Sequence, residues 1–170
     1  MSTAPLVQIT LRIETAVSHA LARQAAGAHQ ETADYAADLL AGAVMGTLEQ
    51  DDPDEARRLQ AELEVKTRAI AIARDLLRGG FDPNVTLKVF KRIKADETLR
   101  DLYERAIGKR PGNDRRNPIK ARINRNLGST IKTAVGAVPH TVDGNVVKVQ
   151  VTDEFILSYT QLAPGPGRKE

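Results

Sequence analysis

The sequence predicts an α+β fold that is mostly α-helical. Aromatic residues make up only 4% of the 170 residues and tryptophan is absent, a composition that suits packed helices better than a large β-sandwich. Apolar residues recur at three- and four-residue steps through most of the chain, which is the spacing of amphipathic helices. Patterns typical of strands are confined to a short run near the N-terminus and to residues 138–162.

Residues 6–14 predict a β-strand, because apolar and polar side chains alternate strictly along them. The apolar face carries Val7, Ile9, Leu11 and Ile13. Helical patterns follow over residues 15–27 and 31–46. A lone strand and two short helices cannot bury their apolar faces within one copy. We therefore expect two copies to pair their strands across a two-fold axis and to pack four helices together.

This N-terminal segment resembles the ribbon-helix-helix family of bacterial and phage repressors over residues 6–46. The resemblance rests on the strand at residues 8–13, the glycine-containing turn near Gly27 and the helix at residues 31–40. It implies a dimeric ribbon-helix-helix unit at the N-terminus of the α+β chain.

The same resemblance implies DNA contacts, since the paired strands of that family enter the major groove. It assigns base contacts to Gln8, Thr10 and Arg12, whose chemistry agrees, because arginine pairs with guanine and glutamine with adenine. It also implies a phosphate contact at the start of the second helix, near residues 30–33. The alternative is that this unit only joins two copies of the protein.

The middle of the chain predicts three helices. An acidic, proline-containing run at residues 49–54 is expected to be a linker, and a long amphipathic helix is expected over residues 55–78. A second helix begins at Pro83 and a third spans residues 98–107. The second helix has a basic outer face, made of Lys88, Lys91, Arg92 and Lys94.

A helix, a glycine turn and a basic helix are what a helix-turn-helix motif needs. Residues 69–107 are somewhat similar to the helix-turn-helix of phage small terminase subunits. The alternative for this stretch is a plain helical bundle.

The C-terminal third predicts a helix followed by a β-hairpin or meander. Pro118 opens a helix with an apolar residue at every fourth position, and its outer face carries polar and basic side chains. Asp143-Gly144-Asn145 predicts a hairpin turn, and another strand is expected within residues 155–162. This arrangement suits either a winged helix or a small dimerisation module. The tail at residues 163–170 is rich in proline and glycine and is expected to be disordered.

Positive charge is concentrated in one stretch of the chain. Residues 88–133 contain fourteen bases and five acids, which gives +9, whereas the whole chain has a net charge of +3. Such a stretch is typical of a phosphate-binding surface. The alternative is a solvated basic face with no ligand.

Several classes of function are not expected. The chain has no cysteine, and its three histidines do not occur at metal-ligand spacings. It lacks a nucleophile–histidine–acid pattern and a Walker-type glycine loop. We therefore expect neither an enzyme nor a cofactor or metal site. No apolar run approaches the length of a membrane span and no signal peptide is evident, so we expect a cytoplasmic, nucleoid-associated protein.

Together these patterns predict a sequence-specific protein that binds double-stranded DNA as a homodimer or higher oligomer, either a transcriptional regulator or a plasmid or phage accessory factor. The expected parts are a dimerisation and DNA-reading domain (1–48), a linker (49–54), a basic domain (55–162) and a tail (163–170). The expected DNA contacts are Gln8, Thr10, Arg12, Lys88, Lys91, Arg92, Arg115, Arg116, Lys120, Arg122, Arg125, Asn126 and Lys132. The alternatives are an antitoxin-like protein whose C-terminal region binds a protein partner, or an oligomeric phage DNA-packaging recognition protein.

Overall fold

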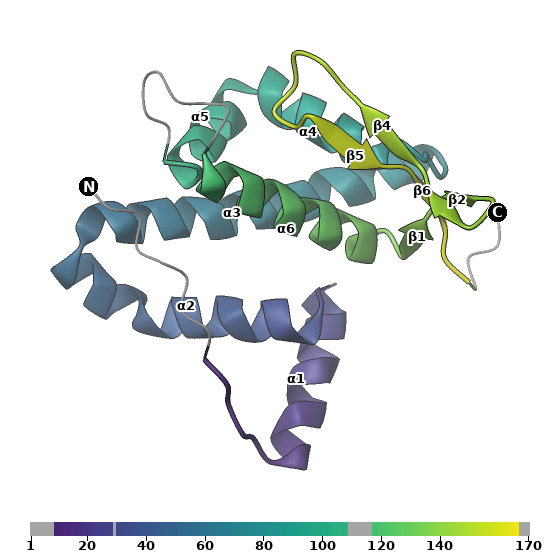
Figure 1. Ribbon diagram of the computed structural model, residues 1–170. Helices are drawn as coiled ribbons and strands as arrows, with labels where there is room; N and C mark the ends of the chain where they lie inside the picture. Colours follow the sequence, from purple (N-terminus) through teal and green to yellow (C-terminus); the bar gives the residue numbers. More distant parts are fainter. Residues whose placement is uncertain (1–8, 29, 109–116, 167–170) are drawn as a thin grey trace.

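The computed structural model of the chain describes residues 9–28, 30–108 and 117–166 and is mostly helical (Figure 1). Its helices are α1 (Thr15–Ala28), α2 (Thr32–Asp51), α3 (Pro53–Leu76), α4 (Val85–Ala95), α5 (Glu97–Ala106) and α6 (Pro118–Ala134), with a 3-10 turn η1 (Leu77–Gly79) after α3. Its strands are β1 (Ala137–Pro139), β2 (Thr141–Val142), β3 (Asn145–Val146), β4 (Lys148–Gln150), β5 (Ser158–Thr160) and β6 (Leu162–Pro164). The predicted α+β class, mostly helical with a small C-terminal β-hairpin region, is confirmed.

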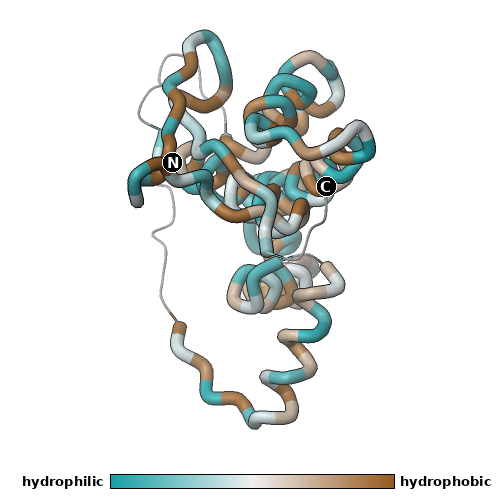
Figure 2. The backbone as a smooth tube through the Cα atoms, turned by 90° about the vertical axis from the view of Figure 1, so that its right-hand side faces the viewer, coloured by the Kyte–Doolittle hydropathy of each residue, from teal (hydrophilic) through white to brown (hydrophobic). Residues whose placement is uncertain are grey.

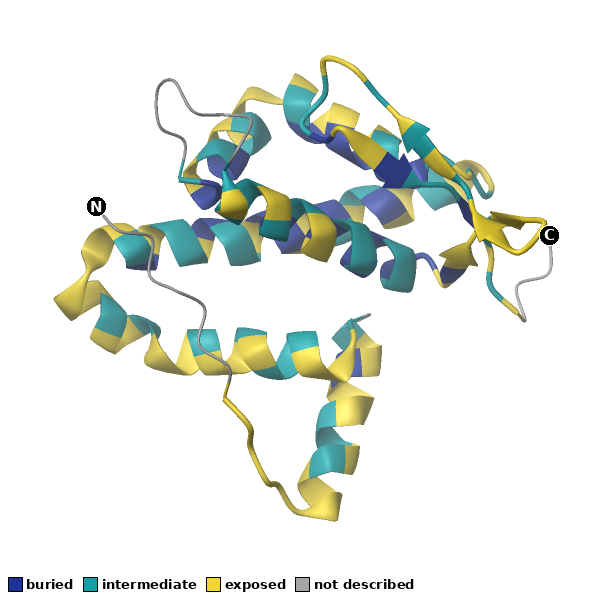
Figure 3. Cartoon of the chain, in the orientation of Figure 1, coloured by how far each residue is buried: buried dark blue, intermediate teal, exposed yellow. Residues whose placement is uncertain are grey.

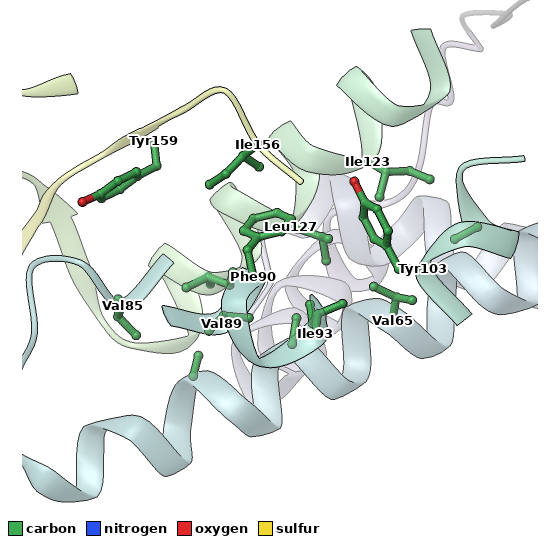
Figure 4. Packing of buried hydrophobic residues seen from close by; sticks show 14 of the residues in the cluster. Val65, Val85, Val89, Phe90, Ile93, Tyr103, Ile123, Leu127, Ile156 and Tyr159 are labelled. Carbon is green, nitrogen blue, oxygen red and sulfur yellow. The ribbon is translucent and has the colours of Figure 1, made fainter. Parts of the chain in front are cut away.

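The core is built around α3, against which α4, α5 and α6 pack. The residues that α3 contributes to this core are small, namely Ala61, Val65, Ala69 and Ala73, and are called its buried row below. Larger side chains of the other elements fill the space between them, among them Phe90, Ile93, Tyr103, Ile123, Leu127 and Ile156 (Figure 4). All members of this cluster lie between Ala61 and Leu162.

The larger apolar side chains of α3 lie beside its buried row and not within it. Leu59, Leu63 and Ile70 are only half-buried, and Leu59 and Leu63 line a space next to α2. The alanine row faces inward because short side chains allow three neighbouring helices to approach the α3 backbone closely. The apolar stripe of α6 is as expected, with Ile123, Leu127 and Ile131 all buried.

The C-terminal strands form short antiparallel pairs. β1 pairs with β6, β2 with β3 and β4 with β5. The expected hairpin turn lies between β2 and β3, where Asp143 (φ 49°) and Gly144 (φ 77°) adopt the positive angles of a type I′ turn. The expected disorder of residues 163–170 is wrong for its first part, because Ala163 and Pro164 pair with β1. Residues 167–170 lie outside the described part of the chain.

Helices α1 and α2 lie outside this core. Ala25 is the only buried residue of α1, and α2 has none among its side chains (Figure 3). The Asp38 carboxylate of α2 accepts hydrogen bonds from Lys66 of α3, at 2.7 Å, and from Gln30, at 2.9 Å. Polar contacts therefore contribute to holding a helix whose apolar side chains remain largely exposed.

The boundary between α2 and α3 is tighter than expected. Residues 49–51 belong to α2 and Pro53 begins α3, so the expected linker at 49–54 is largely helical. Only Asp52 separates the two helices, and its carboxylate accepts a hydrogen bond from the backbone N–H of Glu55 at 3.1 Å. Proline and acidic residues favour a helix start as much as a linker.

The expected strand is not formed in the single chain. Residues 9–14 are neither helix nor strand, and no other described segment pairs with them. Apolar and polar side chains alternate along this segment (Figure 2), and the apolar ones are exposed: Ile9 by 73%, Leu11 by 60% and Ile13 by 49%. A strand at this position would need a partner strand, and none of the described strands pairs with it.

The β1–β6 pair requires glycine at position 165. A Cβ atom there would overlap the backbone carbonyl of Gly136, to which the N–H of Gly165 donates a hydrogen bond at 3.0 Å. We predict that Gly165→Ala lowers the free energy of unfolding by about 1–3 kcal/mol, as overpacked sites do, measured by urea denaturation. Gly42→Ala on exposed α2, where a Cβ meets no atom within 4 Å, is the control and should instead add about 0.5–1 kcal/mol. An unchanged midpoint for Gly165→Ala would contradict this contact.

Candidate nucleic-acid interface

The outer face of α4 is basic, but most of its cations already have partners. Arg92 forms an ion pair with Asp75 of α3 at 2.8 Å, and Lys88 forms one with Asp82. The Lys94 ammonium hydrogen-bonds the carbonyl of Asp153 and lies 3.7 Å from the Glu154 carboxylate. Of the four cations only Lys91 makes no hydrogen bond or ion pair within the described chain.

These partners differ in how firmly they hold the cation. Lys88, Arg92 and Asp75 are each about half-exposed, and exposed pairs of this kind contribute about 0–1 kcal/mol. The side chain of Glu154 is mostly buried and its Oε2 atom has no hydrogen-bond partner, so Lys94 is needed where it is to balance that charge. Arg92 is therefore available to an external phosphate. Lys88 is held by the Asp82 carboxylate, which is only 22% exposed, and Lys94 is a structural residue.

The start of α4 is connected by a polar network to the hairpin formed by β4 and β5, and to Gln161, which follows β5. The amide oxygen of Asn84 accepts hydrogen bonds from Tyr159, at 2.6 Å, and from Gln161, at 3.1 Å. Burial raises the pKa of the Asp82 carboxyl, but hydrogen bonds from Lys88 and from the backbone N–H of Asn84 outweigh it and leave the pKa below its ordinary value. Burial, together with the Asp82 charge, raises the pKa of Tyr159, so its hydroxyl stays a neutral donor.

Arg122 of α6 is a structural residue. Its guanidinium makes two hydrogen bonds, each 2.6 Å long, to the carboxylate of Glu62 on α3. The Arg122 and Glu62 side chains are only 23% and 17% exposed. Glu62 also accepts from Arg58 at 3.0 Å, and hydrogen bonding to Glu55 and Glu62 raises the pKa of Arg58. This network fixes α6 against α3, so the expectation that Arg122 points outward to DNA does not match its position.

The exposed surface of α6 beside Arg122 carries two cations without partners in the described chain. Arg125 and Lys132 lie two helical turns apart, with Ser129 between them, and neither makes a hydrogen bond or ion pair in the part of the chain that the structure describes. Asn126 is exposed on the side that faces α2, and Lys120 is half-buried near the start of the helix. The helix therefore separates its cations into a structural side and a free side.

A cleft of about 360 Å³ lies beside the free side of α6, between this helix, α4 and the strands β5 and β6. Its polar lining includes Arg125, Lys132, Ser129, Ser158 and Thr160, and its apolar lining includes Phe90, Ile156, Tyr159 and Leu162. Figure 4 shows Ile156 above Phe90, with Tyr159 further along the same strand segment. Asn124 also lines the cleft; it accepts a hydrogen bond from the Tyr103 hydroxyl at 2.7 Å and donates one to the Phe155 carbonyl at 3.0 Å.

The remaining expected contacts are distributed elsewhere. Thr10 and Arg12 lie in the exposed segment before α1, far along the chain from the cations of α4 and α6. Gln8, Arg115 and Arg116 lie outside the described residues. The structure therefore brings Arg125 and Lys132 together at one cleft but does not join the ten described members of the expected set into one surface.

The hairpin side of the cleft was missed at the level of sequence. Ser158 and Thr160 line the cleft, and Lys148 is the direct cross-strand partner of Thr160. Directly opposed residues share one face of a strand pair, so Lys148 adds a cation beside this wall. The alternation of residues 158–161 indicated a strand. It did not indicate which residues of the preceding strand pair with them, and that register places Ser158 and Thr160 at the cleft.

No group of three or more acidic or histidine side chains able to hold a metal ion occurs among the described residues. Within the same residues, no helix has both the length and the apolar character to span a membrane.

The two sides of α6 predict different effects on stability. Arg122→Ala should lower the free energy of unfolding by about 1–3 kcal/mol, because it leaves Glu62 poorly compensated in a half-buried position. Arg125→Ala is the matched control and should change it by less than about 0.5 kcal/mol. Urea denaturation followed by circular dichroism measures both, and equal effects would contradict the division of α6 into a structural and a free side.

No match to this chain was found among protein-family models, curated proteins or solved structures, so a function has to be inferred from the residues and geometry described above.

Proposed function

We propose that this protein binds double-stranded DNA as a homodimer, with the stretch 88–133 contacting phosphates and the N-terminal segments of two copies contacting bases. One observation carries the proposal: within a stretch of net charge +9, Lys91, Arg125 and Lys132 have no partner in the described chain. A cation that the fold does not use is free to neutralise phosphate and to release the counterions bound to DNA.

The ionic contacts divide the basic residues into two sets. Arg122 and Lys94 are held by partly buried carboxylates, and the proposal leaves them out of the interface. Arg92 remains in it, because its surface ion pair with Asp75 is weak enough to exchange for phosphate. Lys88 is left out, because its partner Asp82 is only 22% exposed. Arg115 and Arg116, outside the described residues, add to the same basic stretch of the sequence.

The dimer is supported by the exposed apolar side chains of the N-terminal part. Antiparallel pairing of residues 9–13 from two copies would satisfy their backbone N–H and C=O groups and would place Ile9, Leu11 and Ile13 on one shared face. Helix α2 offers further exposed apolar surface at Leu39, Leu40 and Val44. The other face of the ribbon would then present Thr10 and Arg12, with Gln8, to base edges.

The packed core over residues 61–162 supports a DNA-binding accessory factor or regulator over an antitoxin. Antitoxin tails that neutralise a toxin are usually short or disordered before they bind, whereas here α3 to β6 form one continuous cluster. A role in phage DNA packaging remains a form of the same proposal, because it also requires an oligomer that grips DNA through these cations.

The phosphate contacts predict a change in salt dependence. The double variant Arg125→Ala/Lys132→Ala should bind DNA more weakly than the wild type, with a salt slope shallower by about 0.9 for each lost phosphate contact. Fluorescence anisotropy over a salt series measures this. The control is Arg23→Ala/Arg74→Ala, which removes the same charge from two exposed cations outside the basic stretch. If the wild type fails to bind any fragment at low salt, or if both double variants lose affinity equally, the proposed interface is wrong.

The dimer predicts a separable effect of the two faces of residues 9–13. Leu11→Glu should convert the protein to a monomer in sedimentation velocity, because it places a charge on the shared apolar face. Thr10→Glu, on the other face, should remain a dimer but lose DNA affinity. A wild-type protein that stays monomeric at high concentration would contradict the ribbon.

A further inference from the structure

The cleft beside α6 has an apolar lining, which contact with a DNA phosphate backbone does not require. A DNA backbone lies across a surface and requires cations but no apolar depression beneath them. Here the cations Arg125 and Lys132 border a cleft of about 360 Å³ whose floor includes Phe90, Ile156 and Leu162. This volume lies within the range of small-molecule sites, which combine apolar lining with a few polar groups that orient the ligand.

The charge of the cleft is one-sided. None of the described residues that line it is acidic, and Arg125 and Lys132 have no counter-charge elsewhere in the described chain. Ser129 lies between them on α6, while Ser158 and Thr160 supply hydroxyl groups from the opposite wall. An arginine fork, an ammonium and hydroxyl donors together suit a carboxylate or a phosphate group.

The polar and apolar parts lie at different depths. Phe90 is only 1% exposed and Leu162 only 4% exposed, whereas Arg125 is exposed at the edge and Lys132 is half-buried. A ligand that fits both parts has an apolar, ring-sized body that lies on the floor and a single anionic group that reaches the edge. Such a ligand covers apolar surface and neutralises the cations at once.

We propose that this cleft binds a small amphipathic anion, a ring-sized apolar group that carries one carboxylate or phosphate, and that its occupancy competes with DNA for Arg125 and Lys132. The binding of the anion stands on the cleft alone; the competition rests on the proposed DNA-binding function. The result is an effector site that lowers DNA affinity by neutralising two phosphate contacts.

Direct binding is tested by NMR titration of the ¹⁵N-labelled full chain with phenyl phosphate and with benzoate. We expect saturable shifts of the Gly128, Ser129, Ser158 and Thr160 amides with at least one of the two, which also distinguishes phosphate from carboxylate as the preferred group. Benzyl alcohol, which lacks the charge, and inorganic phosphate, which lacks the ring, should each bind at least about tenfold more weakly. The absence of saturable shifts at millimolar concentrations of both anions, or inorganic phosphate binding as well as phenyl phosphate, would overturn the proposal.

A variant whose side chain fills the cleft tests whether the anion binds there. Gly128 lines the cleft, and a Cβ atom there meets no atom within 4 Å, so Gly128→Leu extends into the open space while improving helix propensity. Gly42→Leu on α2 is the control, because its Cβ also meets no atom within 4 Å and it lies outside the cleft. We expect Gly128→Leu to lose the anion by at least about tenfold and Gly42→Leu to bind it as the wild type does, both with unchanged circular dichroism. Equal binding by the two variants would overturn the site.

The two proposals fail separately. Anisotropy in the presence of the preferred anion should show weaker DNA binding by the wild type and no effect of the anion on Gly128→Leu. Saturable NMR shifts in a protein that binds no DNA would retain the ligand site and remove the DNA function. DNA binding that does not respond to a bound anion would overturn the competition.

Discussion

The close approach of three helices to α3 is the constraint on which the rest of this structure depends. Helix axes lie 8–10 Å apart according to the size of the side chains between them, and α3 contributes three alanines and one valine to the buried core cluster. Because that row is shallow, α4, α5 and α6 can each contribute large side chains to one shared cluster. A larger residue in the row would push a neighbouring helix outward and open the cluster.

The positions of the cations follow from this packing. Once α6 lies against α3, one side of it faces Glu62 and the other faces the hairpin, so two arginines three residues apart acquire different roles. Arg122 becomes part of a half-buried network, whereas Arg125 borders a cleft that has no acid in its described lining. The hairpin forms the opposite wall, since hydrogen bonds from Tyr159 and Gln161 to Asn84 hold it at the start of α4.

The N-terminal helices α1 and α2 are not packed into this core. Its helices add almost nothing to the core, with Ala25 as the single buried residue among the described residues of α1 and α2. Apolar side chains that a fold leaves exposed in such a run are typical of a surface that another chain covers. The chain thus separates a packed body from an N-terminal part whose apolar side chains remain largely exposed.

Much of the fold was determined by the sequence itself, because helix periodicity and end chemistry are local. The starts of α1 and α6, the buried stripe of α6 and the Asp143-Gly144 turn all depend on residues within a few positions of one another. The net charge of the stretch 88–133 is likewise a property of the sequence alone. Each of these features can be stated without knowing what lies across the core.

Only the tertiary structure decided what depends on distant partners. Which row of α3 faces inward, which arginine of α6 finds Glu62 sixty residues away in the chain, and which hairpin residues face α6 are set by packing between elements, and no local pattern contains that information. The expected strand at residues 6–14 is another case in which a local pattern does not determine the structure. Its alternation is encoded locally, but a strand exists only when a second edge satisfies its backbone, and the described part of one chain does not supply that edge.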